Sequence, residues 1–263
     1  MERAQEDKKE FLMEMAEAPV SRIEAELAFR YLYKHLDGAL RRGNGELNVL
    51  DVGSGVGEVA LRFAALGHKV TMLEPQACLL TTAEERAKEQ LPERGAFMRF
   101  LNERIEDLEE SQVDEFEVII CHETIEYVDD VLKAFNIITR VLKPRGIVSL
   151  VFLNRYGLIL EKVLKEENIR EALDTFELEE FATSLHQGRG RLYSDDEILA
   201  LLEPLGYNVE GKYGLIVFSE FIDCSLFEED DCYQGMLDLE ERAGEESHLK
   251  AVAKFVQLIC SKA

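Results

Sequence analysis

The sequence predicts an α/β fold: a doubly wound, mostly parallel seven-stranded sheet with N-terminal helices and a helical cap after the fifth strand. Three observations indicate this fold. From residue 48 onward, short apolar runs typical of buried parallel strands alternate with segments of helical length. A glycine-rich turn joins the first strand to the helix after it, and a long excursion separates the last two strands, as expected for an antiparallel edge. We interpret residues 1–263 as a single domain, with 1–43 as N-terminal helices and 154–193 as a cap insertion.

Two helices are expected before the sheet. Glu2–Ala18 is amphipathic and ends before Pro19. The second helix is expected to begin at Ser21, a good N-cap, because Glu24 follows three residues later and completes the pattern of a capping box. The glycines of the segment 43–45 end this helix.

The segment NVLDVGSGVGEVALRFA, residues 48–64, reads as a strand, a glycine turn and a helix. Gly53, Gly55 and Gly57 stand at alternate positions in the turn. Glycine is required where the backbone adopts positive φ or lies against a ligand, and the free amides at a helix start favour a negative group. The GxGxG spacing departs from the GxGxxG of dinucleotide sites, and a tight turn without a ligand would produce the same pattern.

The remaining elements follow in alternation. Further strands are expected at Lys69–Leu73, Phe97–Leu101, Phe116–Cys121, Ile147–Leu153, within Tyr207–Phe221, and at Phe255–Cys260. Helices are expected through Ala77–Ala87, Asp130–Leu142, Ser194–Leu205 and Asp231–Ala243. Asn154–Arg191 lacks strand signals, and we expect helices and loops there.

The composition restricts the class of protein. A formal charge of −23 argues against general nucleic-acid affinity, although a local basic patch remains compatible with it. The longest apolar run, Ile147–Leu153, is too short to span a membrane, and the charged N-terminus is unlike a signal peptide. Five cysteines without CxxC spacing indicate reduced thiols rather than a zinc site. We therefore expect a cytoplasmic protein with no membrane partner and no metal.

Two acids flank the glycine turn. Glu74 ends the second strand, 21 residues after Gly53, where a carboxylate can accept both hydroxyls of a ribose; the alternative is an exposed loop acid. Asp51, inside the first strand, is costly to bury without a partner and can bind an amine or the amides of the turn. No lysine or arginine lies on the turn. Together with Gly55, these residues favour a ligand with an amino-acid end and a ribose end over a phosphate.

These motifs resemble the class I S-adenosylmethionine-dependent methyltransferases, which have a Rossmann-like fold. LDVGSGVG is similar to their first motif, FEVIICHETIEYV to their fourth-strand motif, and KPRGIVSL to the segment entering their fifth strand. A narrower resemblance, extending to YGLIVFSEFI and DCYQGMLDLEER, is to bacterial tRNA 5-carboxymethoxyuridine methyltransferases. It implies S-adenosylmethionine as cofactor and the carboxylate of a modified tRNA wobble uridine as methyl acceptor.

The resemblance also implies roles for individual residues. Gly53 and Ser54 would contact the methionine part of the cofactor, Glu74 its ribose, Ile105 and Glu106 would flank its adenine, and His122 would line its pocket. The cofactor-contacting arginine of the family aligns nearest Glu24, and Arg22 is the candidate replacement. The closing strand of the family carries Arg and His where this chain has Lys254 and Gln257.

The acceptor site is expected just beyond the fifth strand. Asn154, Arg155 and Tyr156 lie where open α/β sheets bind ligands. Arg189 and Arg191, in the sequence GRGR, are either an anion clamp for a carboxylate or RNA phosphate, or a solvated turn.

His122 is the first candidate catalytic residue, and its alternative is a hydrogen-bonded histidine at a strand end. A carboxylate acceptor is already ionised and needs no base, whereas a hydroxyl or amine would need one. Two other hypotheses are open. In one, the chain is a methyltransferase that acts on a small molecule or peptide, which could be cationic given the acidic surface. In the other, it is a non-catalytic binding scaffold.

Overall fold

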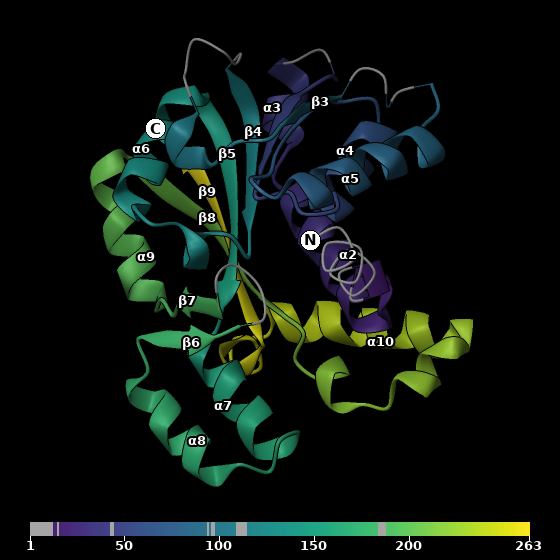
Figure 1. Cartoon of the computed structure of the whole chain (residues 1–263), viewed down its shortest axis with the longest axis vertical. Coiled ribbons are helices and arrows are strands. Elements are labelled where there is room, and N and C mark those ends of the chain that lie inside the picture. The colour runs from purple at the N-terminus through teal and green to yellow at the C-terminus, as the bar shows by residue number, and fades with distance from the viewer. Residues whose placement is uncertain are drawn as a thin grey trace.

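A seven-stranded sheet forms the centre of the computed structural model (Figure 1), which describes residues 13, 14, 16–42, 45–93, 95, 98–108, 115–183 and 188–263. The strand order is β3-β2-β1-β4-β5-β9-β8. The strands are β1 Asn48–Val52, β2 Lys69–Leu73, β3 Arg99–Leu101, β4 Phe116–His122, β5 Leu142–Leu153, β8 Tyr207–Leu215 and β9 Phe255–Lys262. Strands β1 to β5 are parallel, and β9 and β8 continue the sheet in antiparallel pairing. The predicted fold class is confirmed.

Helices cover both faces of this sheet. The α-helices are α2 Pro19–Lys34, α3 Asp37–Arg42, α4 Glu58–Ala65, α5 Ala77–Gln90, α6 Val131–Val141, α7 Arg155–Leu164, α8 Ile169–Asp174, α9 Asp195–Leu202 and α10 Asp230–Glu245. Short 3-10 helices include η2 Ile105–Asp107, η4 Ile125–Tyr127, η5 Thr175–Glu177, η8 Ser219–Phe221 and η10 Lys250–Val252. None of the helices that the structure describes is both long and apolar enough to cross a membrane.

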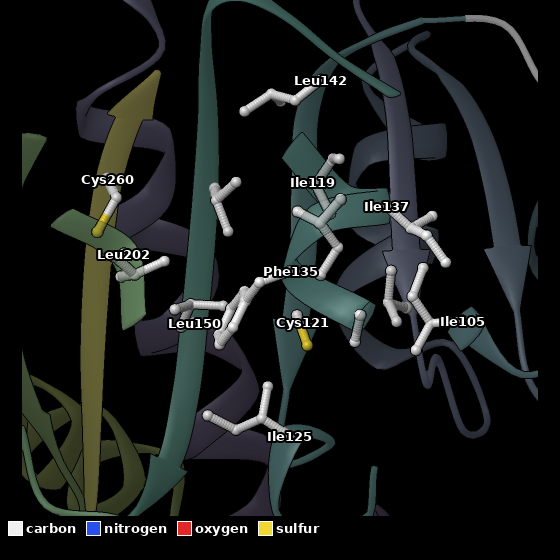
Figure 2. Packing of buried hydrophobic residues seen from close by; sticks show 14 of the residues in the cluster. Ile105, Ile119, Cys121, Ile125, Phe135, Ile137, Leu142, Leu150, Leu202 and Cys260 are labelled. Carbon is white, nitrogen blue, oxygen red and sulfur yellow. The ribbon is translucent and has the colours of Figure 1, made fainter. Parts of the chain in front are cut away.

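Alternate residues of each central strand point to opposite cores, as the period of two in a β-strand requires. Ile119 and Cys121 of β4 pack with Phe135 of α6 on one face, as Figure 2 shows. Val118 and Ile120 of the same strand pack with α2, α4 and α5 on the other face. Because both faces are covered, the site must lie at an edge or an end of the sheet.

The start of the second helix differs from the prediction. Helix α2 begins at Pro19, with Ala18 as N-cap and no capping side chain, so the prediction of a cap at Ser21 is wrong. Proline lacks an amide hydrogen and has a helical φ, which makes it favourable in the first turn. The helix is also broken at His35 before α3 begins. Of the predicted helix Glu2–Ala18, residues 1–12 lie outside the described residues, and so do two of the three residues in the segment 43–45.

Two strand boundaries differ as well. Strand β5 begins at Leu142, which pairs with Phe116, rather than at Ile147. The pairing becomes irregular after Leu142, where Arg145 has φ +61°, so the KPRG segment that ends α6 also belongs to the strand. The described part of the third strand is Arg99–Leu101, and Phe97 lies outside the described residues.

The cap contains α7, α8, η5 and a short hairpin, and it lies beyond the carboxyl end of β5 (Figure 1). The hairpin pairs β6, Glu180–Ala182, with β7, Arg189–Arg191, so the expectation of no strands in the cap is wrong. Strands of three residues are too short to produce a periodic pattern. Gly190 packs against Phe181 and Tyr127, and an added Cβ there would lie 2.4 Å from Cζ of Phe181.

One hydrophobic cluster joins the N-terminal helix, the cap and the sheet. It contains Leu27 of α2, Leu158 of α7, Leu215 of β8 and Leu237 of α10. This shared core supports our proposal that the chain forms a single domain.

Candidate active site

The glycine turn connects β1 to α4, and its three glycines have positive φ of 69°, 53° and 85°. A Cβ on Gly53 would lie 2.2 Å from Oγ1 of Thr124, and one on Gly57 would lie 2.8 Å from Cε of Met72. A Cβ on Gly55 would meet no atom of the described residues within 4 Å, apart from its chain neighbours. Gly53 and Gly57 therefore allow close packing, whereas Gly55 presents bare backbone to open space.

Glu74 lies against this turn. Its side chain is 2 % exposed, so the alternative of a solvated loop acid is excluded. Oε2 accepts a hydrogen bond from the amide of Gly55 at 3.1 Å, and Oε1 accepts one from the amide of Gln76 at 2.8 Å. The amides of Gly53 and Ser54 donate to the carbonyl of Leu73, which fixes the turn beside the end of β2. The two motifs that the sequence separates by 21 residues therefore form one structure.

Two further polar groups lie at the turn. Asp51 is buried, and burial together with the charge of Glu74 raises the pKa of Asp51 to about 7. The hydroxyl of Ser54 is buried without a hydrogen-bond partner among the described residues. Buried polar atoms are normally satisfied, so an orphaned hydroxyl beside an open glycine fits a polar ligand. The donor set suits an amino-acid group and a ribose, the two ends of S-adenosylmethionine.

His122 ends β4 and is half-buried. Its Nε2 lies 2.7 Å from Oγ of Ser149 on β5, and Ser149 Oγ lies 2.9 Å from Nε2 of Gln257 on β9. Burial lowers the pKa of His122 to about 3, so this histidine is neutral at neutral pH. Thr124 connects His122 to the turn, because the single proton of its hydroxyl is shared between the carbonyl oxygens of His122, at 2.8 Å, and Val52, at 3.1 Å.

Ile105 and Glu106 lie in η2, and both side chains are buried. Ile105 packs in the core between the sheet and α6. Glu106 Oε1 accepts hydrogen bonds from the amide of Asp129 at 3.0 Å and from Arg104 at 3.2 Å. A ligand flanked by η2 would therefore contact mainly its backbone.

Arg22 is exposed and packs on α10. Its guanidinium carbon lies 5.2 Å from the ring centroid of Tyr233. Glu24, two residues later, is half-buried and hydrogen-bonded to Glu123, which follows His122. The pKa of Glu24 is raised well above its usual value, chiefly by burial and then by the charge of Glu123. Since two carboxylates cannot both be ionised in such a bond, this pair shares a proton.

No sequence pattern pairs Glu24 with Glu123 or places Glu58 and Lys254 near them. Burial raises the pKa of Glu58, the first residue of α4, to about 7. Lys254, next to β9, lies 3.0 Å from Glu220 and 4.0 Å from Glu161. Glu123 also has an unusual backbone conformation, with φ +46°, which a sequence pattern does not indicate because the residue is not a glycine.

The three residues beyond β5 build the cap. Asn154 is buried, caps α7 through the amide of Tyr156, and donates to the carbonyls of Ala251 and Ala253. The Arg155 guanidinium donates to three carbonyls of the cap, those of Thr175, Phe176 and Leu178, at 3.0, 3.2 and 2.6 Å. Tyr156, by contrast, is 56 % exposed. Asn154 and Arg155 therefore fix the cap in place, and Tyr156 offers a free aromatic surface.

Arg189 and Arg191 are exposed on β7, and each has a carboxylate partner. Arg189 lies 3.3 Å from Glu180, and Arg191 lies 3.5 Å from Glu197 and over the ring of Tyr193. Exposed pairs of this kind contribute about 1 kcal/mol or less, so a ligand anion can displace the carboxylates. Within the described ranges, no group of three or more His, Cys, Asp or Glu side chains is arranged to hold a metal ion.

The sequence is similar to those of known methyltransferases. Residues 50–150, which contain the turn, Glu74 and His122, match the methyltransferase domain family. The chain is 25 % identical to the tRNA 5-carboxymethoxyuridine methyltransferase of Escherichia coli K12 over 240 residues, 88 % of this chain and 86 % of that protein. It is 30 % identical to the ubiquinone biosynthesis O-methyltransferase of Rickettsia akari over 129 residues, 49 % of each.

Solved structures show the same fold. The magnesium protoporphyrin IX methyltransferase of Synechocystis PCC 6803, solved with S-adenosylhomocysteine, superposes with a TM-score of 0.57 at 14 % identity, covering 93 % of this chain and 87 % of that one. An S-adenosylmethionine-dependent methyltransferase from Clostridium acetobutylicum gives 0.55 at 12 % identity, covering 89 % and 92 %. Fold, glycine turn and sequence similarity lead to one conclusion: residues 50–150 form a methyltransferase domain, and the chain is an S-adenosylmethionine-dependent methyltransferase.

Proposed function

We propose that this methyltransferase acts on the carboxylate of a modified wobble uridine in tRNA. One observation carries the proposal: the similarity to the tRNA enzyme of E. coli extends over 88 % of the chain. It therefore includes segments outside the cofactor motifs, among which the acceptor-binding elements must lie. The similarity to the ubiquinone enzyme of R. akari covers only 49 % of the chain. A tRNA substrate also implies a cytoplasmic enzyme.

The cofactor is proposed to lie across the ends of β1, β2 and β4. Gly53, Ser54 and Gly55 would contact its methionine end, with Asp51 near the amine, and Glu74 would accept the ribose hydroxyls. Ile105 and Glu106 would flank the adenine, and His122 would close the pocket. The bound sulfonium supplies an activated methyl group, so the protein has to position donor and acceptor in line. A carboxylate acceptor is ionised at neutral pH, which suits a site whose histidine is neutral and whose Glu24 and Glu123 already share a proton.

The acceptor would be bound from the cap side. Tyr156 provides an exposed ring on which a base can stack. Arg189 and Arg191 provide exposed cations for phosphate groups. Arg22 remains a proposed cofactor-binding residue and the candidate replacement for the arginine of the family. Because its guanidinium packs on Tyr233 of α10, a contact with the cofactor would compete with this packing.

A second candidate is an amine or other cationic acceptor, on a small molecule or peptide. The carboxyl pair of Glu24 and Glu123, with Glu58 nearby, favours it, because these groups attract a cation. Lys254 offsets their charge only in part: it lowers the pKa of Glu24 and of Glu123, but its ammonium group also contacts Glu220 and Glu161. The two candidates differ in the bond that forms: a methyl ester in the first and a methylamine in the second.

The chemical stability of the product distinguishes the candidates. Purified protein is incubated with methyl-labelled cofactor and either tRNA lacking the ester or a small-molecule extract. The first candidate predicts label in tRNA that mild alkali releases as methanol. Alkali-stable label in the extract, with none in tRNA, would support the second candidate and refute the first.

Variants then test the acceptor surface. Replacing Arg189 and Arg191 together by Gln is expected to lower tRNA methylation about tenfold while cofactor binding is unchanged. Arg41→Gln is the matched control, because Arg41 is also exposed and paired with a carboxylate but lies on α3, away from the cap. Equal losses in both variants would exclude a specific role for β7.

A further inference from the structure

A chain of buried hydrogen bonds runs from α2 through β9 and β5 to His122. Gln257, in β9, has no exposed surface, and its Nε2 donates to the carbonyl of Ala28 and to Oγ of Ser149, both at 2.9 Å. Ser149, in β5, is also fully buried, and its Oγ lies 2.7 Å from Nε2 of His122. The chain connects three side chains that are far apart in sequence.

The direction of each hydrogen bond follows from the end at Ala28. A backbone carbonyl only accepts, so the amide atom of Gln257 that faces it must be the nitrogen. That nitrogen has two hydrogens, and the second one points to Ser149. The serine oxygen therefore accepts from Gln257. Among the described residues, its hydroxyl has no hydrogen-bond partner other than Gln257 and Nε2 of His122, so its single proton is assigned to Nε2.

This assignment determines the tautomer of the imidazole. If Nε2 accepts a proton from Ser149, a neutral ring must carry its hydrogen on Nδ1. The low pKa of His122 excludes the doubly protonated ring at neutral pH. Nδ1 makes no hydrogen bond to the described residues, so its N–H is available to a ligand.

We propose that Gln257 and Ser149 are positioning residues that fix His122 as its Nδ1–H tautomer, so that it donates a hydrogen bond to the bound cofactor or acceptor. The hydrogen-bond donor lies beside the turn, because Thr124 ties the His122 backbone to Val52 and contacts Gly53. A neutral donor can bind a carboxylate or hydroxyl oxygen without adding charge. This role also means that His122 is no general base through Nε2. The last step, ligand binding, rests on the proposed function, whereas the tautomer does not.

The tautomer is measured directly by long-range ¹H–¹⁵N correlation on ¹⁵N-histidine-labelled protein without ligand, and the His122→Asn spectrum identifies the signal. The expected pattern is protonated Nδ1 and unprotonated Nε2. A wild-type spectrum with protonated Nε2 overturns the proposal, and this test needs no other variant.

Two variants test the positioning role. Ser149→Ala removes the donor to Nε2, so the signal is expected to shift toward the Nε2–H tautomer. The Kd for S-adenosylhomocysteine, measured by calorimetry, is expected to rise about tenfold, as for the loss of one hydrogen bond. Ser149→Thr keeps the hydroxyl and should restore both values, which a purely structural defect would not do.

The possible outcomes distinguish the positioning of His122 by Ser149 from the contact between His122 and the ligand. An unchanged tautomer in Ser149→Ala contradicts the positioning role. If the tautomer shifts in Ser149→Ala while the Kd and the KM for tRNA are unchanged, Nδ1 of His122 makes no contact with cofactor or acceptor. That result leaves the assignment as a methyltransferase intact. If the wild-type protein has the expected tautomer and binds S-adenosylhomocysteine but does not methylate tRNA, the proposed tRNA acceptor is refuted and the tautomer assignment stands.

Discussion

Replacing Gly55 by Ala separates the cofactor-binding role of the turn from its structural role. Gly55 has φ +53°, and a Cβ there would point into open space. The structural cost is therefore the left-handed backbone alone, about 1–2 kcal/mol. Gly206→Ala is the matched control, because Gly206 has φ +79°, its new Cβ would touch only Ala263 at 4.0 Å, and it lies far from the turn, before β8.

The two variants should lose similar stability and different affinity. For a chain of this size, about 1–2 kcal/mol corresponds to a fall in Tm of roughly 2–8 °C in either variant. In Gly55→Ala, the new methyl group would occupy the space next to the amide that binds Glu74, so we expect the Kd for S-adenosylhomocysteine to rise at least about tenfold. Gly206→Ala should bind normally.

The assays are scanning fluorimetry for Tm and calorimetry for Kd. Equal Kd values for the two variants would refute the inference that Gly55 faces the cofactor. A much larger loss of Tm in Gly55→Ala than in Gly206→Ala would contradict the open space assigned to its Cβ.

Three further predictions concern buried polar groups. Glu240 accepts hydrogen bonds from the amides of residues 217–219, so Glu240→Ala should lower the free energy of unfolding, measured in urea, by about 3 kcal/mol or more. Glu241→Ala is the control: it removes only ion pairs near the surface and should lower that free energy by about 1 kcal/mol or less. Burial raises the pKa of Glu126 to about 8, so the unfolded chain loses this proton at a lower pH than the folded protein does. The stability of the wild-type protein therefore falls as pH rises from about 4.5 toward 8. Glu126→Gln does not titrate, so its Tm relative to that of the wild-type protein should rise over that range. His122→Ala should weaken cofactor binding without removing an acidic limb from the pH–rate profile near neutral pH, because burial lowers the pKa of His122 to about 3. Loss of such a limb with normal binding would show that His122 is a general base instead.

The sequence predicted the glycine turn and the acid at the end of β2 because local constraints determine both. Three glycines at alternate positions can only be a turn with unusual φ, and Glu74 follows a strand whose length the apolar run defines. The capping prediction at Ser21 failed for a local reason too, because Pro19 starts a helix more strongly than a serine two residues later.

The rest of the site depends on the antiparallel register of β9, which no local pattern encodes. That register pairs Val151 with Gln257 and so brings Gln257 beside Ser149, which is 108 residues away. Similarly, Glu24 meets Glu123 only because α2 packs at the end of β4. Such contacts follow from tertiary packing, and a single sequence does not specify them.

In this acidic chain, the cations that could bind an anionic acceptor are already paired with carboxylates. An acceptor carboxylate or phosphate would meet cations that already have partners: Lys254 with Glu220, Arg189 with Glu180, and Arg191 with Glu197. For the exposed arginines, exchanging one carboxylate for another anion costs little, because exposed pairs are weak. For Lys254, which is more enclosed, the exchange would leave Glu220 without its closest partner. An anionic acceptor is therefore easier to bind at β7 than at Lys254, which is the arrangement expected if the cap contacts the RNA backbone while the neutral His122 contacts the reacting end.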